Sequence, residues 1–231
     1  MPTQLFTRLL AALPGQCRVC RHWPSHTVCE DCVATFAQPR PRCSTCALTL
    51  PSGQAHCGAC LKVPPPLNQC LAVVPYAYPW SKLIADFKFH AQSGLAQTLA
   101  SLMKTTPWVE PAVEAADLLL PMPLSSQRLS ERGYNQALLL AHHLQPHKTR
   151  ADLLLRVQDT PAQHTLKRAQ RLHALDMAFA VDPLLAHQLK DKRVVLVDDV
   201  MTTGASLHAA ARVLRSAGVR HITGLVFART E

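Results

Sequence analysis

The chain has 231 residues, of which 48% are apolar and 17% are charged, and its formal net charge at pH 7 is +9. This length and composition predict one or two globular domains with a buried core, and they exclude fibrous, collagen-like and fully disordered chains. No run approaches the roughly 18 consecutive apolar residues that a membrane-spanning helix needs, so we expect no membrane insertion. The basic surplus indicates a polyanionic partner, such as nucleic acid or a phosphorylated substrate.

Residues 1–16 predict a short amphipathic helix. Arg8 is followed by an apolar stretch over residues 9–13 only, which is too short for the apolar region of a secretory signal. We therefore expect a cytoplasmic protein.

Four Cys-x-x-Cys pairs follow, and they hold eight of the nine cysteines within residues 17–60. The pairs are Cys17/Cys20, Cys29/Cys32, Cys43/Cys46 and Cys57/Cys60. Each pair places two sulfurs on one side of a tight knuckle, and two knuckles complete the tetrahedral shell that zinc prefers. Without an export signal, metal ligation is favoured over disulfides. The sequence thus predicts two structural zinc sites, which would lower the net charge to about +5.

The short spacings favour pairing the first knuckle with the second and the third with the fourth, while a cross-braced pairing of first with third stays open. Cys70 stands alone and is predicted to be a buried strand residue without a functional role. Residues 62–66 include three consecutive prolines, a stiff spacer typical of a linker. We therefore expect a double zinc-ribbon domain with its N-terminal helix at residues 1–66, and a second domain at residues 67–231.

The second domain alternates β-rich and helical patterns. Strands are predicted at residues 70–76, 117–120, 194–198 and 221–227, and helices at residues 80–90, 94–103, 135–144 and 204–217, the last one capped by Gly218. This alternation predicts an α/β fold, a mainly parallel sheet flanked by helices. The eight glycines form neither of the two common glycine-rich phosphate loops, so dinucleotide-binding and Walker-type sites are excluded.

A different phosphate site is predicted at the end of the strand at residues 194–198. Asp198 and Asp199 follow a run of buried-type residues, and residues 202–206 then lead into a helix. Adjacent carboxylates can accept hydrogen bonds from the vicinal hydroxyls of a sugar. Free N–H groups at a helix N-terminus suit a phosphate, and Gly204 permits close approach of the backbone. The pattern is typical of a ribose 5-phosphate site, although a strand followed by an N-capped helix is a purely structural alternative.

Residues 194–206 resemble the 13-residue phosphoribosyl pyrophosphate (PRPP) signature of type I phosphoribosyltransferases. The resemblance implies a phosphoribosyltransferase-like domain that binds PRPP with Mg²⁺. It also implies that Asp198 and Asp199 hold the ribose hydroxyls and act in catalysis. The 5′-phosphate would be wrapped by Thr202, Thr203, Gly204, Ala205 and Ser206.

A wider resemblance covers nearly the whole chain. The four knuckles, the sequence Pro-Met-Pro-Leu at residues 121–124, the sequence Arg-Gly-Tyr-Asn-Gln at residues 132–136 and the PRPP signature together resemble the ComF/GntX family. That family implies a role in DNA uptake during natural transformation or in DNA utilisation, with an unidentified phosphoribosyl acceptor. The alternative is a non-catalytic module that binds single-stranded DNA or other uptake proteins and uses the PRPP-type pocket as a sensor.

Arg128 and Arg132 follow the strand at residues 117–120. The resemblance implies a pyrophosphate-binding loop here, in which Arg132 makes bidentate contacts and takes part in catalysis, Arg128 is a second contact, and Gly133 frees neighbouring N–H groups. A solvated basic loop is the alternative. Asn135 is predicted to cap the next helix. Lys88, near the start of the domain, is predicted to point at a phosphate.

The polar segment between residues 156 and 179 resembles the mobile lid that closes over PRPP in transferases. Thr160, Gln163 and Arg171 are its candidate site residues, whereas Ala174 stands where the family pattern has asparagine. Residues 128–171 carry eight basic and three acidic side chains, a net charge of +5. Such a density suits pyrophosphate or a nucleic-acid backbone.

Overall fold

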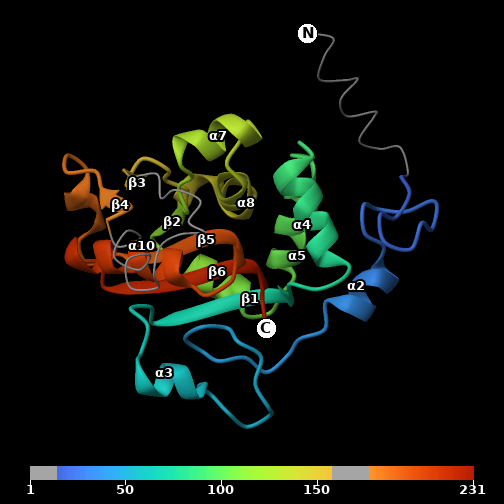
Figure 1. The fold of residues 1–231 in the computed structure, drawn as a ribbon, viewed down its shortest axis with the longest axis horizontal. Coiled ribbons are helices and arrows are strands. Elements are labelled where there is room, and N and C mark those ends of the chain that lie inside the picture. Colours follow the sequence, from blue (N-terminus) through green and yellow to red (C-terminus); the bar gives the residue numbers. More distant parts are fainter. Residues whose placement is uncertain (1–14, 158–176) are drawn as a thin grey trace, which may run out of the picture. The chain divides into compact units, whose positions relative to one another are not determined.

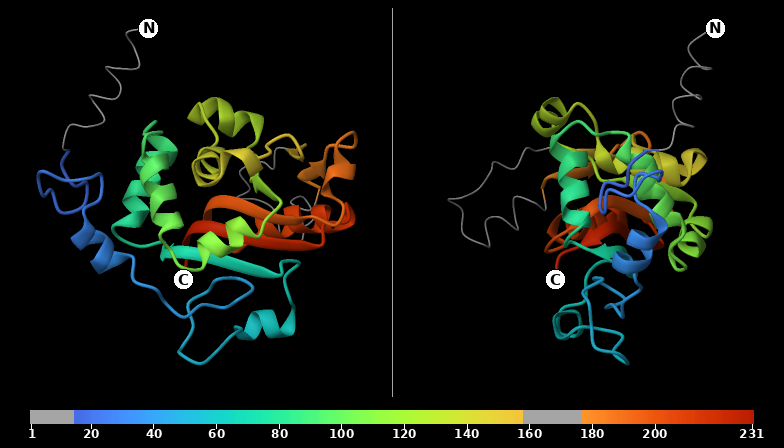
Figure 2. Two further views of the ribbon diagram at one scale, coloured as in Figure 1. Left: turned by 180° about the vertical axis from the view of Figure 1, so that it is seen from behind. Right: turned by 90° about the vertical axis from the view of Figure 1, so that its right-hand side faces the viewer.

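The computed structural model describes residues 15–157 and 177–231, and Figures 1 and 2 show its fold. The chain divides into two compact units, Met1–Gln38 and Pro39–Glu231, and each is described here by itself. Among the described residues, no helix combines the length and the apolar character needed to cross a membrane.

In its described part, residues 15–38, the smaller unit contains a looped segment and the helix α2 (Glu30–Phe36). The loop is closed by reciprocal backbone hydrogen bonds between Gly15 and Ser25, of 3.0 and 2.8 Å. Helix α2 begins directly after Cys29, and its first turn carries Glu30 and Asp31, which suit the positive end of the helix dipole. The cysteines of the second knuckle therefore lie at the N-cap and in the first turn of a helix.

The larger unit is built on a parallel sheet. Within the described residues it contains β1 (Gln69–Pro75), β2 (Leu118–Pro121), β5 (Arg193–Met201) and β6 (His221–Arg229), in the spatial order β1-β6-β5-β2. All three pairings are parallel, so the carboxyl ends of the strands meet at one edge. At that edge Pro75 pairs with Arg229, and Arg229 pairs with Met201.

Helices cover the sheet as the alternating sequence pattern predicts (Figure 1). Helix α8 (Gln136–Leu144) packs on β2 and β5, and α5 (Leu95–Lys104) packs on α8. Helix α10 (Ala205–Ser216) connects β5 to β6, and α4 (Trp80–Phe89) follows β1. The core between them is apolar: the Trp80 ring meets the Phe227 ring edge-on with centroids 5.7 Å apart, and both side chains are fully buried.

The remaining described elements are short. They are the helices α3 (Gly58–Lys62), α6 (Val109–Glu114) and α7 (Ser126–Arg132), the 3-10 turns at Pro146–Lys148 and Ala186–Leu189, and the antiparallel pair β3 (Leu154–Arg156) and β4 (Phe179–Val181). The four strands and four long helices that the sequence predicts are all present, and their ends differ by a few residues. The largest difference is in β5, which continues through Asp198 to Met201 because its pairing with β6 extends to Arg229.

The second cysteine module packs within the larger unit. The N–H of Cys70 donates to the carbonyl of Ser44 (2.7 Å), and the hydroxyl of Thr49 donates to the carboxylate of Glu231 (2.6 Å). The compact unit therefore begins at Pro39, whereas the proline spacer predicts a domain boundary near residue 66. These hydrogen bonds, made across the spacer, are the physical reason for the difference.

Candidate functional site

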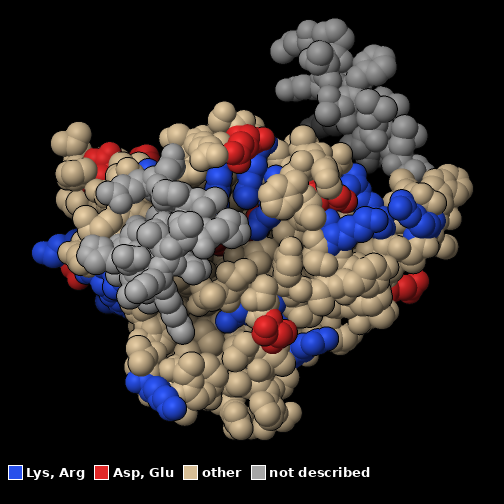
Figure 3. Space-filling model, in the orientation of Figure 1, with Lys and Arg blue, Asp and Glu red and all other residues tan. Residues whose placement is uncertain are grey.

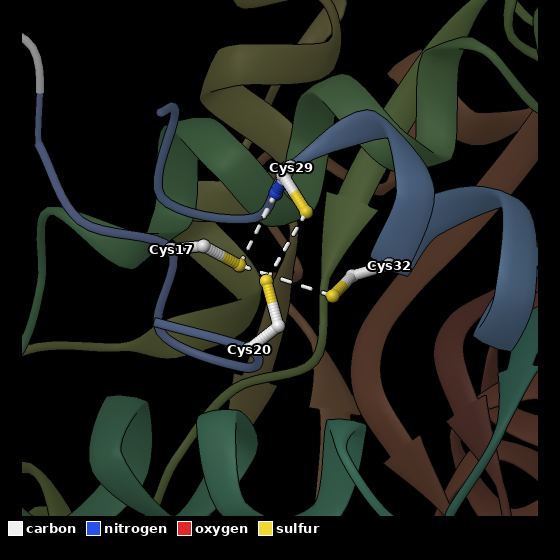
Figure 4. Close-up of side chains that lie close together, drawn as sticks. All are labelled: Cys17, Cys20, Cys29 and Cys32. Carbon is white, nitrogen blue, oxygen red and sulfur yellow. Dashed lines mark hydrogen bonds between the residues drawn. The ribbon is translucent and has the colours of Figure 1, made fainter. Parts of the chain in front are cut away.

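The first four cysteines form a cluster in the smaller unit. The sulfurs of Cys17, Cys20, Cys29 and Cys32 point toward one another (Figure 4) and lie within 4.8 Å of one another. The Cys17 and Cys32 sulfurs are 3.9 Å apart, and those of Cys20 and Cys29 are 3.5 Å apart. A tetrahedral Zn–S₄ site with bonds of about 2.3 Å separates its sulfurs by about 3.8 Å. The cluster has the geometry of a metal site.

The other four cysteines form an equivalent cluster in the larger unit, made by Cys43, Cys46, Cys57 and Cys60. The sulfurs of Cys46 and Cys57 are 3.7 Å apart, and the N–H of Cys57 donates to the sulfur of Cys43 (3.3 Å), a contact that favours a thiolate. The predicted pairing of first knuckle with second and third with fourth is therefore confirmed, and the cross-braced alternative is wrong. The structure shows no disulfide among the described cysteines.

Cys70 is buried on β1 and takes part in neither cluster. Burial raises the pKa of its thiol to about 12, so it is a neutral, apolar-type side chain at physiological pH. This agrees with its predicted place in a buried strand.

A second site lies at the carboxyl edge of the sheet, where β5 ends and α10 begins. Gly204 is the N-cap of α10 and has φ +80°, a conformation that residues with a Cβ rarely adopt. A Cβ at this position would lie 2.3 Å from Cε of Met201 and 3.0 Å from Nε2 of His208. The backbone angle therefore favours glycine at this turn, and a Cβ would also force the flexible end of the Met201 side chain to shift.

This turn encloses a small cavity of about 60 Å³. It is lined by Asp198, Val200, Met201, Thr202, Thr203, Gly204, Ala205, Ser206 and Leu207. The N–H groups of the first turn of α10 have no acceptor within the helix and carry the positive end of its dipole. Two exposed threonine hydroxyls stand beside them. The chemistry of this cavity suits one phosphate group.

The two carboxylates of this site have different surroundings. Asp199 is buried, and its carboxylate oxygen lies 2.8 Å from Nζ of Lys88 in α4. Asp198 accepts a hydrogen bond from the N–H of Asp199 (2.9 Å). Burial and the neighbouring Asp199 charge raise the pKa of Asp198 to about 7, although the Lys88 ammonium acts in the opposite direction. Lys88 therefore lies at the site as an ion-pair partner of Asp199, and its predicted contact with a phosphate stays a prediction.

The segment that carries Arg128 and Arg132 is a helix and not the predicted loop, whereas the predicted contact of its arginines with pyrophosphate stays a prediction. It forms helix α7, because the Ser125 hydroxyl caps its start by accepting from the N–H of Arg128 (3.3 Å) and Gly133 ends it at φ +75°. The N–H of Gly133 donates to Leu129, so it is not free for a ligand. The two arginines project one helical turn apart. Basic side chains gather beside α7 on the face in Figure 3.

The end of α4 connects α7 to the carboxylates. The guanidinium of Arg132 lies over the ring of Phe89 at 5.3 Å and donates to the side chain of Gln136 (3.0 Å). Next to Phe89, Lys88 binds Asp199, and the carbonyl of Phe87 accepts from the hydroxyl of Tyr134. Sequence reasoning assigned no site role to Phe89 or Tyr134. Apolar patterning alone places such aromatic side chains in a core, and it does not reveal their contacts with polar groups.

Asn135 caps α8 as predicted, since its side chain accepts from the N–H of Leu138 (3.2 Å). Its amide also donates to the carbonyl of Met122 (3.1 Å), which fixes the turn after β2. Arg128 is exposed, and no hydrogen bond of its guanidinium is seen among the described residues. Thr160, Gln163 and Arg171, together with the predicted N-terminal helix, lie outside the described residues.

Comparison with known proteins agrees with this geometry. The phosphoribosyl transferase domain family matches residues 140–230, which include β5, the Gly204 turn and α10. Competence protein F of Haemophilus influenzae is 33% identical over 216 residues, covering 89% of this chain and 92% of that protein. DNA utilization protein YhgH of Escherichia coli K12 is 29% identical over 240 residues, covering 96% of this chain and all of that protein.

Competence protein ComFC of Bacillus subtilis is also similar, with 30% identity over 152 residues, which cover 66% of this chain and 60% of that protein. The parallel sheet, the two four-cysteine clusters and these relatives agree with the motifs read from the sequence. The chain belongs to the ComF/GntX family.

Proposed function

We propose that the protein binds Mg²⁺-PRPP at the carboxyl edge of its sheet and acts in DNA uptake or DNA utilisation, transferring phosphoribosyl to an acceptor that remains to be identified. The observation that carries the proposal is the cavity at the Gly204 turn, which is lined by Asp198 and by the first residues of α10, with Asp199 next to Asp198 on β5. A sugar with vicinal hydroxyls and a 5′-phosphate needs both chemistries at this spacing. The names of the relatives support the biological context.

In this proposal Asp198 and Asp199 accept hydrogen bonds from the ribose hydroxyls, and residues 202–206 bind the 5′-phosphate. Arg132 and Arg128 contact the pyrophosphate, and the charge of Lys88 adds to the field at the ribose end. Mg²⁺ keeps several water ligands and usually binds through substrate phosphates and one or two carboxylates, which fits the acidic pair at this edge. Bound Mg²⁺ would neutralise charge on the departing pyrophosphate.

Calorimetric titration of Mg²⁺-PRPP into the zinc-loaded protein tests this proposal. The double variant Asp198→Asn/Asp199→Asn should lose binding. Asp117→Asn is the matched control, because the Asp117 carboxylate accepts from the N–H of Arg193 (2.7 Å) at the opposite end of β5. Absence of binding by the folded wild-type protein, or equal loss in the control, would refute the proposed site.

A non-catalytic binding module is the second candidate, and the net charge of +9 favours it. The two functions share one pocket and differ in chemistry. If the protein is an enzyme, it releases pyrophosphate from PRPP when the acceptor is supplied. The variant Asp198→Asn then loses activity in transformation but keeps its affinity for single-stranded DNA. A binding module shows the reverse pattern, with DNA affinity lost on replacing Arg128 and activity retained in Asp198→Asn.

We further propose that each four-cysteine cluster holds a structural Zn²⁺, because the donor set and the sulfur separations fit a closed tetrahedral site. Thiolate ligation also fits a reducing compartment, in agreement with a cytoplasmic protein. Metal analysis of the purified chain should give two zinc ions per molecule, and Cys20→Ser or Cys57→Ser should each remove one. A metal-free protein that stays folded would refute the assignment.

A further inference from the structure

Arg229 occupies an unusual place at the end of β6. It is the last residue of that strand, and its backbone pairs with Met201 on one side and with Pro75 on the other. Its side chain is almost fully buried, with 8% exposed. Neither the PRPP signature nor the cysteine motifs include it.

The guanidinium of Arg229 joins two functional parts of the larger unit. On one side its Nε donates to the carbonyl of Cys46, a member of the second four-cysteine cluster (2.9 Å). On the other side its Nη1 donates to the carbonyl of Met201 (3.3 Å) and to that of Thr202. Met201 and Thr202 begin the turn that lines the phosphate cavity. One planar guanidinium therefore connects the second four-cysteine cluster to the turn that lines the phosphate cavity, which we call the phosphate turn.

The positive charge of Arg229 makes this link sensitive to negative charge at the second four-cysteine cluster and at the phosphate cavity. The ion pairs formed among the described residues do not include Arg229, and its donors meet carbonyl and hydroxyl oxygens. A buried cation without a carboxylate partner is stabilised by other nearby negative charge. A zinc ion with four thiolates has a net charge of −2, and a ligand phosphate is also an anion.

Further contacts strengthen the same junction. The N–H of Thr230 donates to the carbonyl of Met201 (3.0 Å), so the backbone after Arg229 also holds the turn. The carboxylate of Glu231 accepts from Thr49 and pairs with Arg42 (3.4 Å), which fixes the chain end to the second cysteine module. The last three residues thus form one continuous connection between the module and the turn.

We propose that Arg229 is a positioning residue that orders the phosphate turn by anchoring it to the second four-cysteine module, so that the metal in this module controls ligand affinity at the turn. The effect on affinity rests on the proposed binding of Mg²⁺-PRPP, whereas the ordering of the turn is a property of the protein alone.

Hydrogen–deuterium exchange of residues 200–207 measures the order of the turn directly, with residues 222–227 of β6 as an internal reference. Arg229→Lys keeps the charge but loses the fork, and its exchange at the turn should be at least about tenfold faster, with unchanged exchange in β6. Arg215→Lys is the matched control, because the Arg215 fork also binds backbone carbonyls, those of Val219 (3.1 Å) and Arg220 (2.7 Å), near the start of β6. The control should exchange at the turn like wild type.

Metal withdrawal supplies a measurement that does not depend on the Arg229 variant folding. In Cys20→Ser zinc can occupy only the second module, and removing it with a chelator should speed exchange at the turn selectively. Exchange that stays unchanged at the turn, or that rises equally in β6, overturns the coupling.

Affinity for Mg²⁺-PRPP gives the second readout. We expect Arg229→Lys and Cys57→Ser to bind at least about tenfold more weakly than wild type, and Arg215→Lys to bind normally. If wild type does not bind Mg²⁺-PRPP while exchange at the turn still depends on zinc and Arg229, the proposed function fails and the ordering role stands. If wild type binds and neither readout depends on Arg229, the coupling alone is wrong.

Discussion

Nζ of Lys88 lies 2.8 Å from a carboxylate oxygen of Asp199, and this ion pair joins the last turn of α4 to the carboxyl end of β5. Both side chains are largely buried, with 18% and 6% exposed. A buried carboxylate needs such a partner, because desolvation penalises its charge. The same ammonium lowers the electrostatic cost of placing Asp198 next to Asp199.

Replacing Lys88 with methionine removes this compensation and leaves the buried Asp199 carboxylate without its cation. We expect Lys88→Met to lower the free energy of unfolding by about 1–3 kcal/mol at pH 7 and to weaken binding of Mg²⁺-PRPP. Urea unfolding and calorimetry measure the two effects. Lys82→Met on the same helix is the control, because Lys82 is exposed and its replacement should change neither quantity. Equal stability of the two variants would contradict a structural role for the pair.

The raised pKa of Asp198 predicts a pH dependence of stability. The folded protein keeps the Asp198 proton up to a pKa of about 7, whereas the unfolded chain loses it near the ordinary value of 3.8. Between these values the folded state binds more protons, so this group makes the protein less stable as pH rises. Asp198→Asn should therefore be more stable than wild type at pH 8, by up to about 4 kcal/mol, and nearly equal to it near pH 4.

Urea unfolding of both proteins across this pH range isolates the effect, because the histidines that also titrate are common to both. A stability difference that does not vary with pH would show that Asp198 has an ordinary pKa. A carboxylate that destabilises the fold at neutral pH is typical of a residue retained for ligand binding.

Most of the fold could be predicted from the sequence, and the failures have local causes. The apolar run of Val and Leu at residues 194–197 and the periodic apolar residues of α5 and α8 are strong local signals, and each one predicts its element without further information. Helix α7 lacks them, since its one large apolar residue, Leu129, is exposed. It is held by the Ser125 cap and the Gly133 end, so the capping residues were the signal that could have identified it.

The candidate site also has a part that could be predicted from the sequence and a part that could not. The residues of the Gly204 turn are contiguous, so their spacing alone predicts the cavity that they line. The contacts of Lys88 with Asp199 and of Phe89 with Arg132 join elements far apart in the chain, and no local pattern specifies them. Arg229 acts through its position at the end of β6, which depends on the register of the sheet.

The Gly204 turn should not tolerate a side chain. Gly204→Ala strains a backbone at φ +80° and places Cβ against Met201 and His208, so we expect a loss of about 1–2 kcal/mol in stability and of at least about tenfold in affinity for Mg²⁺-PRPP. Gly218→Ala at the other end of α10 is the control. Its φ is +85° and its nearest neighbour is 3.6 Å away, so it should lose stability to a similar degree but keep its affinity. Equal affinities of the two variants would show that the turn does not contact the ligand.

The contact between Phe89 and Arg132 predicts a selective effect on the pyrophosphate end of the ligand. Phe89 is exposed, yet its ring lies 5.3 Å from the Arg132 guanidinium, a contact that favours this direction of the guanidinium. Phe89→Leu keeps an apolar side chain but loses the ring face, and it should weaken binding of Mg²⁺-PRPP about three- to tenfold. Binding of ribose 5-phosphate, which has no pyrophosphate, should not change.

Arg132→Lys should show the same selectivity, because a lysine loses the planar fork that binds two phosphate oxygens. The double variant Phe89→Leu/Arg132→Lys should then bind PRPP no more weakly than Arg132→Lys, since Phe89 acts only through the arginine. Additive losses in the double variant would show that Phe89 contacts the ligand itself. Equal losses for PRPP and ribose 5-phosphate would instead place Arg132 at the ribose phosphate end.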